Sequence, residues 1–124
     1  MNAENELSGL VIKCAIEVHR NLGAGLLESA YSAALAHELT LAGVPFQSEV
    51  ELPVKYKGTT LGISYRLDLL VGGRLIVELK SVEQFLSIHE AQLLTYLKLS
   101  GLSLGLLINF NVPLLKQGIK RLII

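Results

Sequence analysis

Residues 67–80 decide the fold of this chain, and they read Leu-Asp-Leu-Leu-Val-Gly-Gly-Arg-Leu-Ile-Val-Glu-Leu-Lys. Two short apolar runs flank Gly72-Gly73, a pattern typical of two strands joined by a tight turn. Asp68 interrupts the first run, and Glu78 and Lys80 interrupt the second. Side chains two residues apart lie on the same face of a strand, so Glu78 and Lys80 are predicted to point the same way.

The length of the turn decides whether Asp68 joins them. A two-residue loop, Gly72-Gly73, would set Asp68 opposite Val77, on the other face from Glu78. A three-residue loop that includes Arg74 sets Asp68 directly opposite Glu78, with the two Cβ atoms roughly 4.5–5.5 Å apart. We favour the three-residue loop, which places Asp68, Glu78 and Lys80 on one face of the sheet.

Two carboxylates at that separation call for a counter-charge. They repel each other by about 3 kcal/mol at an effective dielectric constant of about 20. Carboxylate oxygens suit Mg²⁺ or Mn²⁺, and a metal ion held there can clamp a phosphate and activate a water molecule. Lys80 can orient that water or neutralise charge that develops on phosphorus. The plainer alternative is that Glu78 and Lys80 form a surface ion pair at a sheet edge.

The rest of the chain alternates between helical and strand periodicity. Apolar residues recur at three- and four-residue steps in two segments before Pro45, and a Ser87-Ile88-His89-Glu90 sequence resembles a capping box at the start of another helix. Pro53 lies inside an alternating strand, which indicates a sheet edge. We expect helices at about 4–21, 26–42 and 88–99, and strands at about 46–56, 61–71, 75–80, 102–109 and 119–124.

Composition restricts the class of protein. A chain of 124 residues is predicted to form a single domain, residues 1–124. Hydrophobic residues make up 51% and charged residues only 18%, where about 25% is usual, so we expect a homo-oligomer or, alternatively, a subunit of a larger complex. The net charge is zero, so any contact with nucleic acid must be local. A basic C-terminal quarter offers one such patch.

Other sequence features argue against membrane, secreted and zinc-binding classes. The most apolar run, Leu104–Ile108, has the length of a strand and not of a membrane span. The acidic N-terminus does not resemble a secretory signal, and the single Cys14 cannot form an internal disulfide, so we expect a cytoplasmic protein. The three histidines and Cys14 are not at the close spacing of zinc ligands.

Four segments of the chain resemble a known family. Asp68 followed by Glu78-Leu79-Lys80 resembles the core of the PD-(D/E)xK nucleases, although Leu67 stands where that core often has proline. The segment Gly25-Leu26-Leu27-Glu28-Ser29-Ala30-Tyr31 is similar to the motif that names the GxxExxY protein family, a prokaryotic group in that superfamily. Gln92-Leu93-Leu94-Thr95-Tyr96 resembles the QxxxY element of the RecB-like branch, and residues 108–113 resemble the closing segment of the family.

The resemblance implies a restriction-endonuclease-like α/β core, a mixed central β-sheet flanked by helices, that hydrolyses phosphodiester bonds of nucleic acid with Mg²⁺ or Mn²⁺. It makes Asp68 and Glu78 metal ligands, with Glu28 as a further acid near the metal, and Lys80 the catalytic lysine. Gln92 and Tyr96 complete the site, and their i,i+4 spacing places both on one helix face. Tyr31 is expected in the core.

Two alternatives stay open at this point. Glu28 on its own is explained by the preference for acidic residues in the first turn of a helix. The neutral charge and apolar excess favour a non-catalytic module that keeps the nuclease fold and binds protein or nucleic acid, because a fold does not establish a function.

Overall fold

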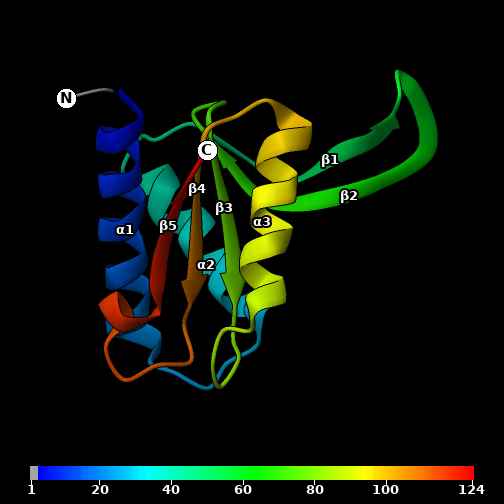
Figure 1. Ribbon diagram of the computed structural model, residues 1–124. Coiled ribbons are helices and arrows are strands. Elements are labelled where there is room, and N and C mark those ends of the chain that lie inside the picture. Colours follow the sequence, from blue (N-terminus) through cyan, green and yellow to red (C-terminus); the bar gives the residue numbers. More distant parts are fainter. Residues whose placement is uncertain (1–2) are drawn as a thin grey trace.

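A sheet with the strand order β1-β2-β3-β4-β5 forms the centre of the computed structural model, which describes residues 3–124 (Figure 1). β3 and β4 are parallel, and the other neighbours are antiparallel, so the predicted mixed sheet flanked by helices is confirmed. The elements in chain order are α1 (Ala3–Leu22), α2 (Glu28–Leu41), β1 (Phe46–Tyr56), β2 (Thr59–Val71), β3 (Leu75–Lys80), α3 (Ser87–Ser100), β4 (Leu104–Asn109), the 3₁₀ helix η1 (Leu115–Gly118) and β5 (Ile119–Ile123).

Each face of the sheet carries its own apolar core. One cluster joins α1 and α2 to the sheet through residues such as Val11, Leu35 and Leu106. The other joins α3 to the opposite face through Leu93 and Leu107. All six residues of β4 are buried, as expected for a strand covered on both faces. Within the described residues, no helix combines the length and apolar character needed to cross a bilayer.

The turn between β2 and β3 has the predicted three-residue length. Leu69 pairs with Val77 and Val71 pairs with Leu75, which leaves Gly72, Gly73 and Arg74 as the loop. Both glycines have positive φ angles, of 60° and 69°, a conformation that costs glycine little. Extending this register by one residue sets Asp68 opposite Glu78, so the alternative two-residue loop is wrong.

Apolar residues alternate along the sequence from Leu61 to Val71, a pattern that predicts a single shared face, and this prediction is wrong. Leu67 packs in the cluster under α3, whereas Leu69 packs in the cluster under α1 and α2. β1 changes face at the same level. Phe46 packs with the cluster under α1 and α2, whereas Val50 packs with the cluster under α3. Glu49, between them, has a φ angle of 51°. This left-handed residue breaks the alternation and turns the outer part of the β1–β2 hairpin relative to the sheet.

The start of α3 also differs from the expectation. The capping residue is Leu86, and Ser87 is already helical. The Nδ1 atom of His89 accepts a hydrogen bond from the Leu86 backbone N–H at 3.1 Å, in the place predicted for Glu90. Glu90 instead forms an ion pair with Lys120 of β5, with 2.9 Å between Nζ and Oε2. The capping-box prediction was therefore wrong, although the predicted helix is present.

Candidate active site

Asp68 and Glu78 meet where the pairing of β2 with β3 ends. The backbone N–H of Asp68 donates to Oε2 of Glu78 at 2.8 Å, and the backbone N–H of Leu79 donates to Oδ2 of Asp68 at 2.8 Å. Each carboxylate thus takes the place of a backbone carbonyl on the opposite strand. Among the residues that the structure describes, none donates a hydrogen bond to the other two oxygens, Oδ1 of Asp68 and Oε1 of Glu78.

Burial works against the charge of this pair. Glu78 is only 5% exposed, and Asp68 is partly buried. Loss of hydration, followed by the charge of Asp68, raises the pKa of Glu78 to about 8. Burial also raises the pKa of Asp68, against the opposing effects of the Leu79 N–H and the Lys80 ammonium. Lys80 lies close enough to lower the pKa of both acids, which places it beside the pair as predicted.

An open cleft of about 380 Å³ leads to Asp68 from the α2 side. Its polar lining consists of three acids and three serines, namely Glu28, Glu49, Asp68, Ser29, Ser32 and Ser48. Glu78 is not part of this lining, because it is buried. A ligand in the cleft therefore meets Asp68 directly.

The Gly25-to-Tyr31 motif positions Glu28 at the first residue of α2. Gly25 has a φ angle of 95°, which favours glycine, and the Tyr31 hydroxyl donates to the Gly23 carbonyl at 2.6 Å. The same hydroxyl accepts from the Leu26 N–H at 3.1 Å. The buried Tyr31 ring stacks on Phe110 with 4.4 Å between ring centroids, so its expected place in the core is confirmed.

The start of α2 is held near the end of β3 by the segment that follows this strand. The Ser81 hydroxyl donates to the Leu26 carbonyl at 2.6 Å. Asn109, which is 2% exposed, donates to the Val82 carbonyl at 2.8 Å and accepts from the Val82 N–H at 3.1 Å. Glu28 is thereby close enough for its charge to raise the pKa of Asp68 and Glu78. The sequence offered no signal for this role of Asn109 beyond the resemblance of residues 108–113.

Tyr96 approaches the acids from the α3 side. Burial, followed by the charge of Glu78, raises the pKa of its hydroxyl, and its ring lies 5.8 Å from the ring of Tyr65. Gln92 lies one turn earlier on α3 and is partly buried. In the part of the chain that the structure describes, no hydrogen bond joins Gln92 to either acid.

Glu49 is a residue near the site that the sequence did not identify. The pairs Ser48–Leu69 and Val50–Leu67 on either side of it place it opposite Asp68, and its charge raises the pKa of Asp68. In the sequence it was one of several charged residues in an alternating strand. Only the pairing of β1 with β2 and the left-handed backbone of Glu49 bring it to the cleft.

The donor set of the acid pair fits a divalent cation. Two carboxylates each keep one oxygen without a hydrogen bond, at a place where their own charges repel, and oxygen donors are the ligands that Mg²⁺ prefers. A preformed set of three is absent: residues 3–124 contain no group of three or more His, Cys, Asp or Glu side chains arranged to hold a metal ion. Glu28 is exposed at the start of its helix and is near the pair without joining it in such a group.

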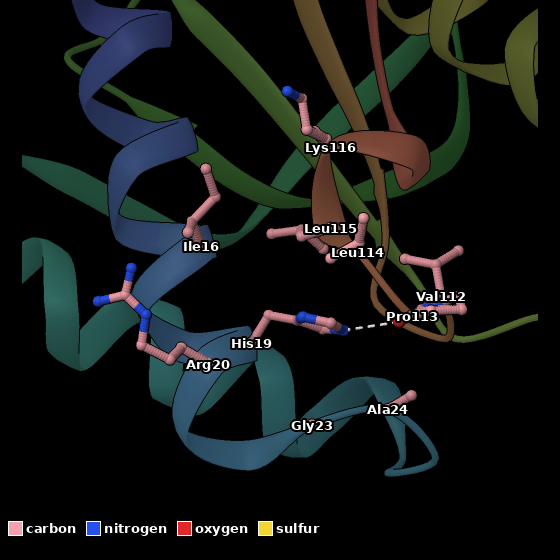
Figure 2. Close-up of a pocket in the computed structure, with 10 residues that line it drawn as sticks. All are labelled: Ile16, His19, Arg20, Gly23, Ala24, Val112, Pro113, Leu114, Leu115 and Lys116. Atoms are coloured by element: carbon pink, nitrogen blue, oxygen red, sulfur yellow. Dashed lines mark hydrogen bonds between the residues drawn. The ribbon is translucent and has the colours of Figure 1, made fainter.

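A larger pocket, of about 510 Å³, lies between α1 and the segment that follows β4 (Figure 2). None of the ten residues that line it carries a carboxylate. In Figure 2 the His19 ring points from α1 toward the segment after β4, where its Nε2 forms a hydrogen bond of 2.8 Å with the Val112 carbonyl oxygen. This contact fastens the segment to α1, which is a structural role.

Comparisons with known proteins give one match. A family model described as the PD-(D/E)XK nuclease superfamily matches residues 5–122. Searches of curated proteins and of solved structures found no match.

Proposed function

The chain belongs to the PD-(D/E)XK nuclease superfamily, and from this premise we propose that it hydrolyses phosphodiester bonds of nucleic acid with the help of Mg²⁺ or Mn²⁺. The observation that carries the proposal is the hydrogen bonding of the acid pair. Asp68 and Glu78 each hold one oxygen against the opposite strand and keep the other free. When bound to those oxygens, the metal ion supplies an activated water and neutralises the charge on the phosphate.

The residues around the acid pair have separate proposed roles. The backbone N–H groups of Asp68 and Leu79 fix the two carboxylates before any ligand arrives, so little reorganisation is needed on binding. Lys80 places a positive charge beside the pair, where it stabilises the charge that develops on phosphorus. Glu28 faces the cleft next to Asp68 and is positioned to orient water. Tyr96 is near the acids on the α3 side, and it is proposed to contact the substrate together with Gln92, one turn earlier on the same helix.

Finer classification rests on the motifs. The Gly25, Glu28 and Tyr31 pattern supports the GxxExxY group, and Gln92 with Tyr96 supports the RecB-like branch. We also propose that the protein is a homo-oligomer, in which exposed apolar side chains such as Leu27 and Ile123, which are 77% and 68% exposed, are covered by a second copy. A cytoplasmic location is proposed because a chain with one cysteine needs no oxidising compartment.

The proposal is tested with purified wild type and Lys80→Met on a panel of single- and double-stranded DNA and RNA. We expect Mg²⁺-dependent cleavage by wild type and a loss of about 2–4 kcal/mol of transition-state stabilisation in Lys80→Met, a size typical of electrostatic donors. Lys13→Met, at an exposed position of α1 that does not line the cleft, is the matched control and should cleave normally. Equally poor cleavage by wild type and Lys80→Met, with no metal effect on the melting temperature of either, would favour the non-catalytic binding module.

A further inference from the structure

The outer part of the β1–β2 hairpin extends beyond the body of the protein (Figure 1). We call residues 53–65 the arm. β2 begins to pair with β3 only at Leu69, so in the arm the two strands pair with each other alone. Every residue of β2 from Thr59 to Arg66 is exposed. The arm therefore contributes little to the apolar core, and most of its side chains are exposed.

The arm has a well-defined backbone. Tyr56 pairs with Thr59 around a two-residue turn in which Lys57 and Gly58 have φ angles of 50° and 80°. Two positive φ angles at these positions give the turn whose twist matches the flanking strands. The Lys57 ammonium lies 5.4 Å from the centre of the Tyr56 ring. A bulge between Pro53 and Lys55 adds further twist. These features hold a two-stranded ribbon in one shape.

The side chains of the arm suit a polyanion. Lys55 and Lys57 are its only charged residues, so a chain with zero net charge carries two unopposed positive charges here. Exposed rings and aliphatic groups accompany them: Tyr56 is 60% exposed and Ile63 is 58% exposed. A second copy of the arm is a poor occupant, because an arm-to-arm contact would bring the lysines of both copies together. Phosphate groups, in contrast, attract Lys55 and Lys57, so a polyanion is the better partner.

The arm also has a fixed relation to the acid pair. β2 is continuous from the turn to Asp68, which lies nine residues beyond Thr59. Because the bulge puts two extra residues in β2, the length is taken from β1, where the seven residue steps from Tyr56 to Glu49 run beside Thr59 to Asp68. At about 3.3 Å per residue this is about 23 Å, or about seven base-pair steps of 3.4 Å. The major groove of a duplex is about 12 Å wide and admits a two-stranded β-ribbon. A single duplex is therefore long enough to meet the arm and the acids at once.

We propose that the arm binds in the major groove of double-stranded nucleic acid and holds the scissile strand over Asp68, an inference that rests on the function proposed above. Lys55 and Lys57 contact phosphates on the walls of the groove. The exposed apolar side chains of the arm contact sugars and thymine methyl groups.

Duplex binding by the full-length chain in EDTA tests this inference without any cleavage. Fluorescence anisotropy with a labelled duplex of 30 base pairs gives the affinity between 0.05 and 0.2 M salt. The test variant is Lys55→Ala/Lys57→Ala. The control is Lys13→Ala/Arg20→Ala, which removes the same charge from α1, on the other side of the molecule (Figure 1).

We expect the arm variant to bind about thirtyfold more weakly than wild type at 0.15 M salt. The variant lacks two phosphate contacts, so its binding releases fewer counterions from the duplex. The slope of log affinity against log salt should become shallower by about 1.8, and the control should match wild type. Equal losses in both variants, no loss in the arm variant, no duplex binding by wild type, or an equal loss on single strands would overturn the proposal. A lower mass in light scattering for the arm variant, with unchanged duplex affinity, would instead make the arm an interface between copies.

The outcomes separate this inference from the proposed function. If the arm is needed for duplex binding but the protein does not cleave with Mg²⁺, the proposed role of the arm stands and the proposed nuclease function is wrong. If the protein cleaves with metal but wild type and the arm variant bind duplex equally, the nuclease function stands and the proposed role of the arm is wrong.

Discussion

Without metal, the stability of this protein should fall as the pH rises, and Glu78 should be the cause. Burial and the charge of Asp68 raise the pKa of Glu78 from 4.5 to about 8 in the folded protein. Between these two values the folded state keeps a proton that the unfolded chain has lost. The stability associated with that proton is fully present below about pH 4.5 and is lost as the pH rises through about 8.

The size of the effect follows from the shift. Each pH unit inside this window costs 1.36 kcal/mol for one proton, so wild type should lose about 3 kcal/mol of unfolding free energy between pH 5 and pH 7. Glu78→Gln keeps an oxygen that accepts the Asp68 N–H and removes the titrating group. The variant should lose little over the same range and should be more stable than wild type at pH 7.

Urea unfolding at pH 5, 6 and 7 in EDTA measures these free energies. Glu83→Gln, an exposed glutamate in the segment before α3, is the control and should follow wild type. Contributions from the residues that the three proteins share cancel in the differences between them. Equal pH dependence in wild type and Glu78→Gln would refute the argument that burial and the charge of Asp68 raise the pKa of Glu78.

Three further predictions concern the support of the site and the assembly. Tyr31→Phe removes two hydrogen bonds, to Gly23 and Leu26, and should lower the unfolding free energy by about 2 kcal/mol while raising amide exchange in residues 23–27. Asn109→Ala removes the side chain that hydrogen-bonds both the N–H and the carbonyl of Val82, and it should lower the unfolding free energy by about 2–3 kcal/mol, measured by urea unfolding. Light scattering at micromolar concentration should give a mass of a dimer or larger; a stable, soluble monomer of 13.5 kDa would contradict the assembly.

The centre of the fold was predictable because its signals are local. The Gly72-Gly73 turn and the two apolar runs around it are adjacent in sequence, and the choice of a three-residue loop fixed the register of Asp68 against Glu78. β4 was recognisable as a buried strand from its continuous apolar residues. Tyr31 followed from helical periodicity alone, although its part in holding the loop before Glu28 did not.

The parts that were not predicted depend on tertiary context. Leu61 and Ile63 alternate as in a half-buried strand, yet both side chains are exposed, because this part of β2 pairs only with β1. The change of face near Glu49 depends on one left-handed residue that is not glycine. At the start of α3, Ser87 and Glu90 have the spacing of a capping box but do not form one. His89 instead accepts a hydrogen bond from the backbone N–H of Leu86.

The central claim, that Asp68 and Glu78 hold a divalent cation, is tested most directly by crystals soaked in Mn²⁺. Anomalous scattering should locate an ion bound by the two oxygens that lack hydrogen bonds, Oδ1 of Asp68 and Oε1 of Glu78, and Asp68→Asn crystals soaked in the same way should lack it. Density for Mn²⁺ only elsewhere on the molecule, or none in wild type at millimolar Mn²⁺, would contradict the claim.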